Sequence, residues 1–553
     1  MGWNSVKFNV SDIKGLYSQH KGFTRALWTL VFSTFHSSFF ILPFSFFLFL
    51  FLVACDDYDT FTSDRSAVLR FDRDTVAFDT LLATVPSTTK VLSVHNLGDK
   101  GLRIREVRLE LGAQSPFRVN VDGQDMTRNA DRCLTDFEVR RRDSIIVRLE
   151  VTLPESGTDL PQPVSDALLF TLESGVCQRV ALVAAVQNAI FLQHSVLTAD
   201  TTFAASRPIV VRDSLVVGEG STLTLAAGTQ LYFHDGAGLT VRGRLVAQGT
   251  AEQPVVFRTD RTDRMFPYLP YDRLPARWQG IRIAPTSYEN ELAGIDLHGA
   301  NYGIQCDAPA NLSDKRTKLS LTNSQIHMIG GIGLSTTDAR VVAVNTEVSN
   351  TLGHGVYVCG GDVSFTHCTL AQFYPLDANR GQALYISYDD SLGFHPLERA
   401  DFLNCVVTGY ADDVIIIPQL NRNLLPSDHS DMSINYVFDH CFLATVVPES
   451  TREANYAARF VDCVYEDKDA NGTSQGTNTS SESDTSHEKN FLLFDTHAFL
   501  YDFTPVAESR IRGVADATRA SLFSLDRLGR DRMADGKPDA GAYEGPMEEK
   551  KES

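Results

Sequence analysis

The sequence predicts an all-β protein in which a β-sandwich precedes a right-handed parallel β-helix. Two observations predict the helix: a short phrase that recurs six times between Leu321 and Tyr465, and glycines that separate short apolar strands ahead of it. A third observation, a series of short alternating apolar runs with turn residues between them, predicts the sandwich.

Residues 1–55 predict a signal for export. No charged residue occurs from Ala26 to Ala54, where Phe and Leu are abundant. This run exceeds the ~20 residues that span a bilayer, so a retained helix is the alternative to a cleaved signal. The tetrad Leu52 to Cys55 decides between them, because it resembles the lipobox of bacterial lipoproteins. The resemblance implies cleavage before Cys55, with lipid on its thiol and amino group anchoring the chain in a membrane.

Acidic residues follow Cys55 directly, at Asp56, Asp57 and Asp59. Acids in this position resemble the surface-export signal of Bacteroides-type bacteria. That resemblance implies a lipid-anchored protein on the outer face of the outer membrane. The alternative is an ordinary acidic linker, which we place at 56–67.

Charge and cysteine spacing exclude several classes of partner. The formal net charge is −19, and a surface of that sign repels nucleic acid. The basic run from Arg140 to Arg142 is followed at once by Asp143, as is typical of a solvated strand edge. No CxxC pair occurs among the eight cysteines after Cys55, so zinc-finger and redox spacings are missing and we predict no metal site.

The predicted sandwich covers 68–190 and is of immunoglobulin type. Its apolar runs are four to ten residues long, and turns such as Asp122-Gly123 and Glu173-Ser174-Gly175 divide them. Cys133 and Cys177 would form a disulfide in an oxidising compartment if their backbones lie close enough.

The predicted β-helix covers 195–545. Its first part has apolar strands of four or five residues with glycines between them, which permit the positive-φ corners that bend a chain into a coil. Its second part repeats an Asn, His or Asp followed by Ser, Thr or Cys, at steps of 22, 22, 37, 36 and 22 residues. The six pairs are Asn323-Ser324, Asn345-Thr346, His367-Cys368, Asn404-Cys405, His440-Cys441 and Asp462-Cys463.

Each position of the phrase predicts a column along the stacked coils. The first residue of each pair is of a type enriched at left-handed backbone positions, so we expect it at a corner. The residues two before and three after it are apolar and should stack inside, with the small Ser, Thr and Cys column between them. Zinc binding by these His and Cys residues is the alternative, but neighbouring residues of a coil point in different directions, which favours a ladder of inert buried thiols.

The chain resembles the parallel β-helix lipoproteins of Bacteroides-type bacteria, whose solenoid is pectate-lyase-like. The motifs that carry the resemblance are Arg142-Asp143-Ser144, Asp166-Ala167-Leu168-Leu169-Phe170, Val180-Ala181-Leu182-Val183-Ala184, Ala227-Gly228-Thr229, Val241-Arg242-Gly243, Trp278-Gln279-Gly280-Ile281 and Asp539-Ala540-Gly541-Ala542-Tyr543-Glu544. This family implies an exported surface protein of uncharacterised function, and it supplies no catalytic residue.

Several residues are candidates for catalysis on polysaccharide. Gly353-His354-Gly355 and two acidic pairs resemble the polygalacturonase-type glycoside hydrolases, but here the acids follow the GHG sequence instead of preceding it. A lyase would instead need a base beside a cation, Ca²⁺ included, and no other cofactor is expected. The candidates are His354, Arg380, Asp389, Asp390, Asp412 and Asp413, with His395 as a further lyase group.

Ligand binding is expected where the period breaks. The longer steps predict inserted loops near 374–395 and 418–431, and loops on neighbouring coils can wall a solenoid face. A proline-fixed aromatic segment from Phe266 to Trp278 is a second candidate, and its alternative is a cap on the solenoid edge. The aromatic candidates for stacking on sugars are Tyr268, Tyr271, Trp278, Tyr374, Tyr385 and Tyr388. A disordered loop is expected at 466–490 and a charged tail at 546–553.

The sequence therefore predicts a surface lipoprotein that binds glycans or other cell-surface partners without catalysis. A polysaccharide lyase or glycoside hydrolase is the first alternative, and a structural component of an outer-membrane complex is the second. Carboxylate geometry discriminates among them: an acid cluster with Arg or Lys would favour chemistry, whereas an aromatic and amide-lined face would favour binding.

Overall fold

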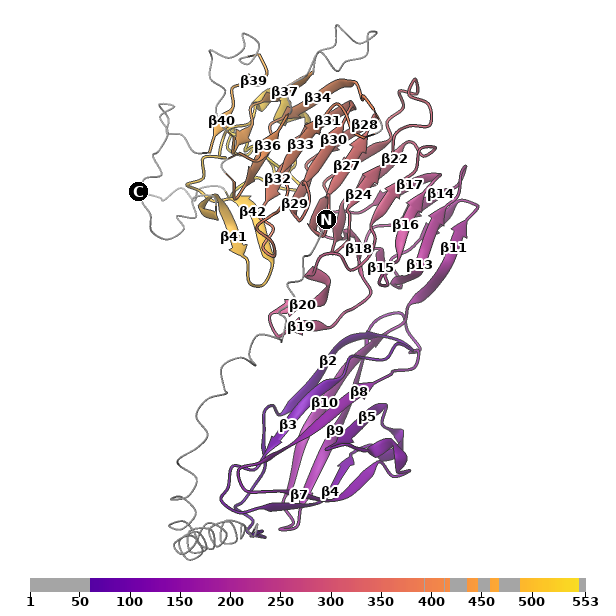
Figure 1. The fold of residues 1–553 in the computed structure, drawn as a ribbon, viewed down its shortest axis with the longest axis vertical. Helices are drawn as coiled ribbons and strands as arrows, with labels where there is room; N and C mark the ends of the chain where they lie inside the picture. The colour runs from indigo at the N-terminus through magenta and orange to yellow at the C-terminus, as the bar shows by residue number, and fades with distance from the viewer. Residues whose placement is uncertain are drawn as a thin grey trace, which may run out of the picture.

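A computed structural model describes residues 60–391, 393–411, 413–417, 435–445, 458–466 and 488–546. Cys55 with the export signal, Asp412, and the loop predicted near 418–431 lie outside these ranges, as does most of the 466–490 loop and of the 546–553 tail. The described residues form an N-terminal domain of two sheets and a long stack of coils, seen in indigo to purple and in magenta to yellow (Figure 1). No helix of the described ranges has the length and apolarity that a bilayer crossing requires.

The N-terminal domain consists of two five-stranded sheets around one apolar core. The first sheet has the order β1 (Arg70–Phe71), β3 (Lys90–His95), β8 (Ser144–Val151), β5 (Phe117–Val121) and β6 (Gln124–Asp125). The second has the order β2 (Thr75–Leu82), β10 (Cys177–Gln187), β9 (Gln162–Leu172), β4 (Leu102–Leu109) and β7 (Cys133–Val139). Alternate residues of each strand, such as Leu92, Val147 and Phe170, are buried between the sheets, as the alternating sequence predicts.

Cys133 and Cys177 do not form the disulfide considered above, and both thiols are free. They begin strands β7 and β10, between which β4 and β9 lie in the same sheet. Three strand spacings amount to roughly 14 Å, about twice the Cα separation that a disulfide tolerates.

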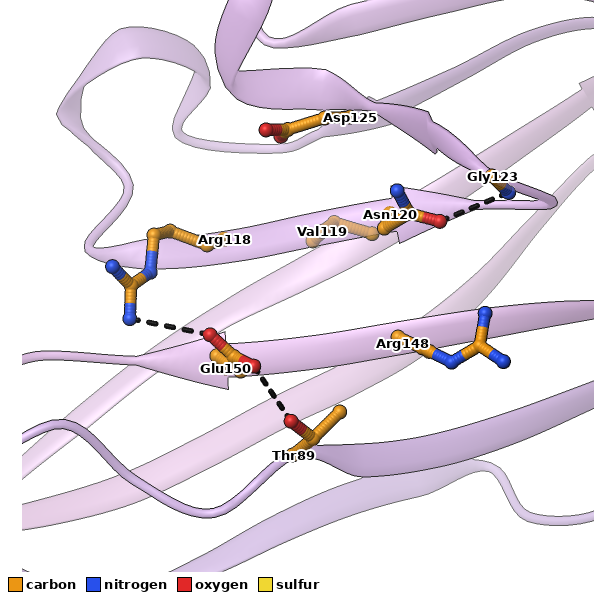
Figure 2. A pocket seen from close by; sticks show the side chains of 8 residues that line it. All are labelled: Thr89, Arg118, Val119, Asn120, Gly123, Asp125, Arg148 and Glu150. Carbon is orange, nitrogen blue, oxygen red and sulfur yellow. Dashed lines mark hydrogen bonds and ion pairs between the residues drawn. The ribbon is translucent and has the colours of Figure 1, made fainter.

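The outer surface of the first sheet carries a shallow pocket of about 420 Å³ (Figure 2). Arg118 and Glu150, on neighbouring strands, form an ion pair of 3.3 Å there, and Thr89 donates a hydrogen bond to Glu150. Exposed pairs of this kind contribute little, and the pocket brings no group of unusual reactivity together.

The coils are built from three rows of parallel strands. The first row contains β15 (Gln230–Phe233), β18 (Val255–Thr259), β23 (Ile295–His298), β26 (Gln325–Ile329), β29 (Glu347–Thr351), β32 (Thr369–Gln372), β35 (Val406–Gly409), β38 (Phe442–Leu443) and β40 (Val464–Tyr465). The second contains β16 (Gly238–Val241), β21 (Ile281–Ile283), β24 (Ile304–Cys306), β27 (Leu334–Thr337), β30 (Val356–Cys359), β33 (Leu384–Ser387) and β36 (Ile415–Ile416). The long strands β11 (Ile190–Leu197) and β13 (Ile209–Val217) cross both rows at the start of the stack.

The third row contains β12 (Thr201–Phe203), β14 (Thr222–Leu225), β17 (Arg244–Gln248), β22 (Asn290–Ala293), β25 (Leu319–Thr322), β28 (Arg340–Val344), β31 (Gly361–Thr366), β34 (Leu397–Leu403), β37 (Tyr436–Asp439) and β39 (Phe460–Val461). Each coil thus adds one strand to each row and buries its inward side chains against the next coil. This architecture is the solenoid of parallel sheets that the recurring phrase predicts.

The six corner residues of the phrase lie between the third and the first row, and all have a positive φ of 47–55°. Their left-handed conformation is the one that the Asn, His and Asp column predicts. Inside the corner, Phe365, Phe402, Phe438 and Phe460 stack with ring centroids 4.8–5.1 Å apart. The thiols of Cys368, Cys405 and Cys441 are buried beside them, and burial raises the pKa of the Cys405 thiol, so these residues form the buried column that the phrase predicts.

The C-terminal segment lies along the outside of these corners. It contains a hairpin of β41 (Phe491–Asp495) and β42 (Leu500–Pro505) and the short helix α2 (Ala517–Leu522). Gly541 approaches the coils so closely that a Cβ would lie 2.7 Å from Thr369 Oγ1, and its φ is +90°. The motif from Asp539 to Glu544 is therefore a docking segment.

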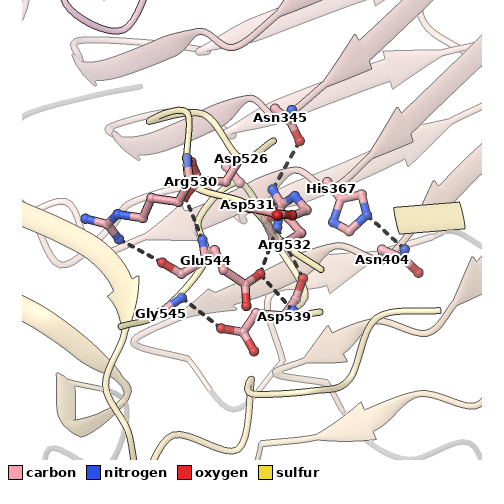
Figure 3. Close-up of polar contacts among 12 residues, drawn as sticks. Asn345, His367, Asn404, Asp526, Arg530, Asp531, Arg532, Asp539, Glu544 and Gly545 are labelled. Atoms are coloured by element: carbon pink, nitrogen blue, oxygen red, sulfur yellow. Dashed lines mark hydrogen bonds and ion pairs between the residues drawn. The ribbon is translucent and has the colours of Figure 1, made fainter. Parts of the chain in front are cut away.

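Arg532 holds this segment in place (Figure 3). Its guanidinium is fully buried and donates to Asn345 Oδ1 at 3.1 Å and to the carbonyl of Gly541 at 2.9 Å, and it lies 3.7 Å from Glu544. The nearby corner residue His367 contacts Asn404 at 3.0 Å, and burial, together with the positive charge of Arg532, lowers its pKa. The corner column thus has a second role, because it binds the end of the chain.

Candidate functional site

A cavity of about 350 Å³ lies where the two-sheet domain meets the first row of the coils. Thr80 and Leu82 line it from strand β2, and Tyr232, Arg258, Arg264, Pro270 and Asp272 line it from the coils. Its volume is within the range of small-molecule sites. We call it the junction cavity.

The wall of the junction cavity is the segment from Asp260 to Trp278, which leaves the coil after β18. It forms a hairpin of β19 (Arg264–Phe266) and β20 (Leu269–Pro270), followed by the 3₁₀ turn η3 (Tyr271–Arg273). Thr262 Oγ1 donates a hydrogen bond of 2.8 Å to the carbonyl of Thr80, which ties the segment to the two-sheet domain. The paired residues Arg264 and Pro270 face the cavity from the base of the hairpin.

Two aromatic rings project from the tip of the same hairpin. Phe266 is 47% exposed and Tyr268 is 41% exposed, and their rings stack with centroids 5.6 Å apart. The His497 ring, from the loop between β41 and β42, packs 3.8 Å from the ring of Tyr268. Exposed aromatic rings beside a polar cavity are suited to stacking on the apolar faces of sugar rings.

A cluster of carboxylates and imidazoles adjoins the cavity on the outer surface of the first row. We call Asp272, Asp296, His298 and His327 the Asp296 cluster. Asp296 Oδ1 lies 2.9 Å from His298 Nδ1 and 3.0 Å from His327 Nε2. His298 Nε2 lies 3.6 Å from Asp272 Oδ2, which Arg258 also contacts at 2.7 Å. Asp272 belongs to both the cluster and the cavity wall, and Arg258 of the wall contacts it, so the two features are continuous.

The electrostatics of the cluster favour its charged forms. Burial lowers the pKa of His298, but the charges of and hydrogen bonds to Asp296 and Asp272 outweigh burial and raise it to about 9. Burial raises the pKa of Asp272, but His298 and Arg258 outweigh it and hold it at about 2. Perturbed groups that gather in a recess are typical of functional sites.

Sequence reasoning missed the Asp296 cluster, although one signal was present. In a strand, residues two apart lie on one face, so Asp296 and His298 had to share a surface. His327 lies beside His298 because Leu297 pairs with Ile326, 29 residues on. That step differs from the 22-residue period that starts at Leu321, so alignment of the recurring phrase could not bring these residues together.

The structure exposes some of the aromatic residues predicted to bind a ligand and buries others. Tyr268 is exposed and Tyr271 is partly buried, under the guanidinium of Arg261 at 3.6 Å. Trp278 is 1% exposed and stacks on Phe233 at 4.2 Å in the core, so it cannot face a ligand. Tyr374 and Tyr388 are likewise buried, and this corrects the expectation for these three residues. The expectation was wrong because aromatic residues are buried in this fold as readily as they line its surface.

Tyr385 lies on the outer surface of the second row instead. Its ring stacks with that of Tyr357, with centroids 5.6 Å apart, and is tilted against that of His354, with centroids 4.6 Å apart. All three are partly buried. All three are less exposed than Phe266 and Tyr268, so this row offers less aromatic surface than the hairpin tip.

The candidates for catalysis have local structural partners. His354 Nδ1 accepts a hydrogen bond from the backbone of Gln382, and burial lowers its pKa. Arg380 donates to the carbonyl of Tyr374, and Asp413 accepts from Thr445 and from the backbone of Ile415.

Of the loop acids beyond β33, Asp390 contacts a histidine that also contacts Asp338, from the turn after β27. His395 lies between Asp338, at 2.7 Å, and Asp390, at 3.1 Å. Asp389 contacts Ser387. A cleft with two facing acids beside His354, as a polygalacturonase-type site would have, is not formed by these contacts.

Comparison with known proteins adds little. No protein-family model matches the chain, and no curated protein matches it. A family 123 glycoside hydrolase from Clostridium perfringens is similar over 22% of this chain and 26% of its own, at 7% identity and a TM-score of 0.16. The PapD-like domain of human CEP192 (11% identity, TM-score 0.15, 23% of this chain and 89% of that one) and a protein of unknown function from Porphyromonas gingivalis (14%, 0.15, 24% and 60%) are similar to the same extent. The chain spans about a quarter of the hydrolase, and likenesses this low carry no argument.

Proposed function

We propose that the protein is a glycan-binding surface lipoprotein whose ligand site is the junction cavity with its aromatic hairpin. The observation that carries the proposal is the hairpin itself, which supplies Arg264 to a polar cavity and exposes Phe266 and Tyr268 beside it. Sugars need both contacts, because ring faces stack on aromatic rings while hydroxyl groups bond to charged side chains. In this proposal the two-sheet domain is of immunoglobulin type, and the solenoid is a right-handed, pectate-lyase-like β-helix.

The first test is a glycan array probed with the detergent-solubilised full chain and with two single variants, Phe266→Ala and Tyr268→Ala. Removal of a stacking ring should weaken binding to any hit about two- to tenfold, because a stacked aromatic contact is worth about 0.5–1.5 kcal/mol beyond burial. Tyr385→Ala, which removes a ring of the second row, is the matched control and should bind normally. Loss of binding in Tyr385→Ala alone would place the ligand on the second row and contradict the proposal.

Polysaccharide cleavage is the alternative function, and the Asp296 cluster favours it as an acid cluster with an adjacent arginine. Each glycan hit should therefore be incubated with the protein, with and without Ca²⁺, and examined by mass spectrometry for shortened products. Intact glycan is the expected result for a binding protein. Products that disappear in Asp296→Asn would establish an enzyme instead.

Lipid anchoring through Cys55 belongs to the same proposal and rests on the lipobox-like tetrad. Cells that express the wild type should retain the protein in the outer membrane and expose it to an impermeant label. Cells that express Cys55→Ser should lose membrane retention. Unchanged retention of that variant would contradict the anchor.

A further inference from the structure

The Asp296 cluster has the donor set of a transition-metal site. Asp296 Oδ1, His298 Nδ1 and His327 Nε2 all lie within 4.8 Å of one another, and both imidazole nitrogens converge on the same carboxylate oxygen. Two imidazoles with one carboxylate is a common ligand set for Zn²⁺ and other first-row divalent metals. The row of parallel strands fixes this convergence, because Asp296 and His298 share one face of β23 while His327 lies opposite His298 on β26.

The second ring nitrogen of His298, Nε2, also faces a carboxylate. A metal-binding histidine usually donates its other ring N–H to a carboxylate, which fixes the tautomer and the ring orientation. His298 presents Nε2 to Asp272 at 3.6 Å, and Arg258 holds Asp272 at 2.7 Å. This outer pair comes from a different segment of the chain, so it is independent of the three inner donors. Nδ1 of His298 is thereby left facing Asp296.

Access and surroundings are compatible with a bound ion. The side chain of His298 is 9% exposed, whereas those of His327 and Asp296 are 20% and 28% exposed, so two of the three side chains are partly open to solvent. The donors lie beside the junction cavity through Asp272, and protein ligands would leave further coordination positions open.

We propose that Asp296, His298 and His327 bind one divalent transition-metal ion, with Asp272 orienting His298. Imidazole ligands favour Zn²⁺ over Ca²⁺, which prefers oxygen donors only. The metal site does not depend on the glycan proposal, because its formation is measured without any glycan.

Metal binding is tested on the full chain without a polyhistidine tag, by equilibrium dialysis against Zn²⁺ and by Co²⁺ absorption spectra. We expect one Zn²⁺ per chain and a Co²⁺ spectrum without a thiolate charge-transfer band. His327→Ala and Asp296→Asn should abolish this uptake. Asp272→Asn, which retains all three ligands, should weaken it 10- to 100-fold.

Two control variants make the outcome decisive. His234→Ala removes an exposed histidine that pairs with Asp260, at 2.7 Å, and should leave uptake unchanged. His395→Ala removes the histidine of a second grouping, Cys359, Asp390 and His395, and should also leave it unchanged. Wild-type protein that takes up no Zn²⁺, or uptake lost in His395→Ala and retained in His327→Ala, would overturn the proposal. Circular dichroism of each variant verifies that the fold is intact.

Discussion

The carboxyl of Glu544 is buried under the C-terminal segment, where Asp539, Asp535 and Arg532 are its charged neighbours. Burial, followed by the charge of Asp539, raises its pKa from 4.5 to about 8, although Arg532 acts in the opposite direction. Because the folded-state pKa exceeds the unfolded one, the folded chain binds the extra proton between these two values. Stability that is fully present below pH 4.5 is therefore lost as the pH rises through 8.

Glu544→Gln mimics the protonated carboxyl and should remove this dependence. Its free energy of unfolding, relative to that of the wild type, should rise by about 2–4 kcal/mol between pH 5 and pH 8. Urea denaturation at both pH values measures the difference. Glu138→Gln, at a carboxylate that is 52% exposed, is the control and should show no such trend. A pH-independent difference in Glu544→Gln would contradict the assignment.

At the scale of the elements, the corner between β25 and β26 shows what holds the coils in register. Asn323 is exposed there with a φ of 50°, and its side-chain oxygen accepts a hydrogen bond from Asn345, one coil further on. Corner side chains thus link coils that the strand ladders already pair. The left-handed conformation is unfavourable for β-branched residues and natural for glycine.

Substitutions at Asn323 should separate conformation from hydrogen bonding. Asn323→Gly and Asn323→Val both lose the bond to Asn345, so the difference between them reports the backbone alone. We expect the Val variant to be less stable than the Gly variant by about 1–2 kcal/mol, measured by chemical denaturation. Equal stabilities would show that the corner relaxes out of the left-handed region.

The parts of the solenoid that sequence predicts are those in which one residue type recurs at the same position of the repeated phrase. The aromatic column Phe365, Phe402 and Phe438 was predictable because its members hold the same position in the phrase. Trp278 was misplaced, because it precedes the regular coils and no repeated position marks it as inward. The contact of Arg532 with Asn345 spans 187 residues and has no local signature. The Asp296 cluster was likewise not predictable, because the position of His327 beside His298 depends on the length of the coil between them.

At the scale of the whole molecule, the two domains are joined by a short and rigid connection. Only two residues separate β10 from β11, and one of them, Asn188, accepts a hydrogen bond from the backbone of Ser156 and donates to the carbonyls of Ser156 and Thr158. Leu82 of the two-sheet domain packs with Val210 and Tyr232 of the coils. Arg207 and Asp159 add an ion pair of 2.5 Å across the same junction. The junction cavity therefore has walls that are held in place from both sides.

Leu82→Asp should loosen this junction without touching either core. An unpaired charge in the apolar contact is costly, so we expect the joint to open and the two domains to unfold as separate thermal transitions. Differential scanning calorimetry measures the transitions, and limited proteolysis should cut near 187–190. Leu160→Asp, at a leucine that is 72% exposed, should behave like the wild type. A single unchanged transition in Leu82→Asp would show that the junction contributes little.

Arg532 also has a consequence for the order in which the molecule assembles. Coils of a solenoid can add one after another as the chain emerges, since each strand pairs with the strand of the preceding coil in its row. The corners at Asn345 and Asn404, however, remain uncovered until residues 516–544 arrive to satisfy them. Loop closure over so long a distance is slow compared with local pairing. These two corners therefore stay partly solvated until a segment made well after them docks, and a chain halted before residue 532 would present an unfinished surface to its surroundings.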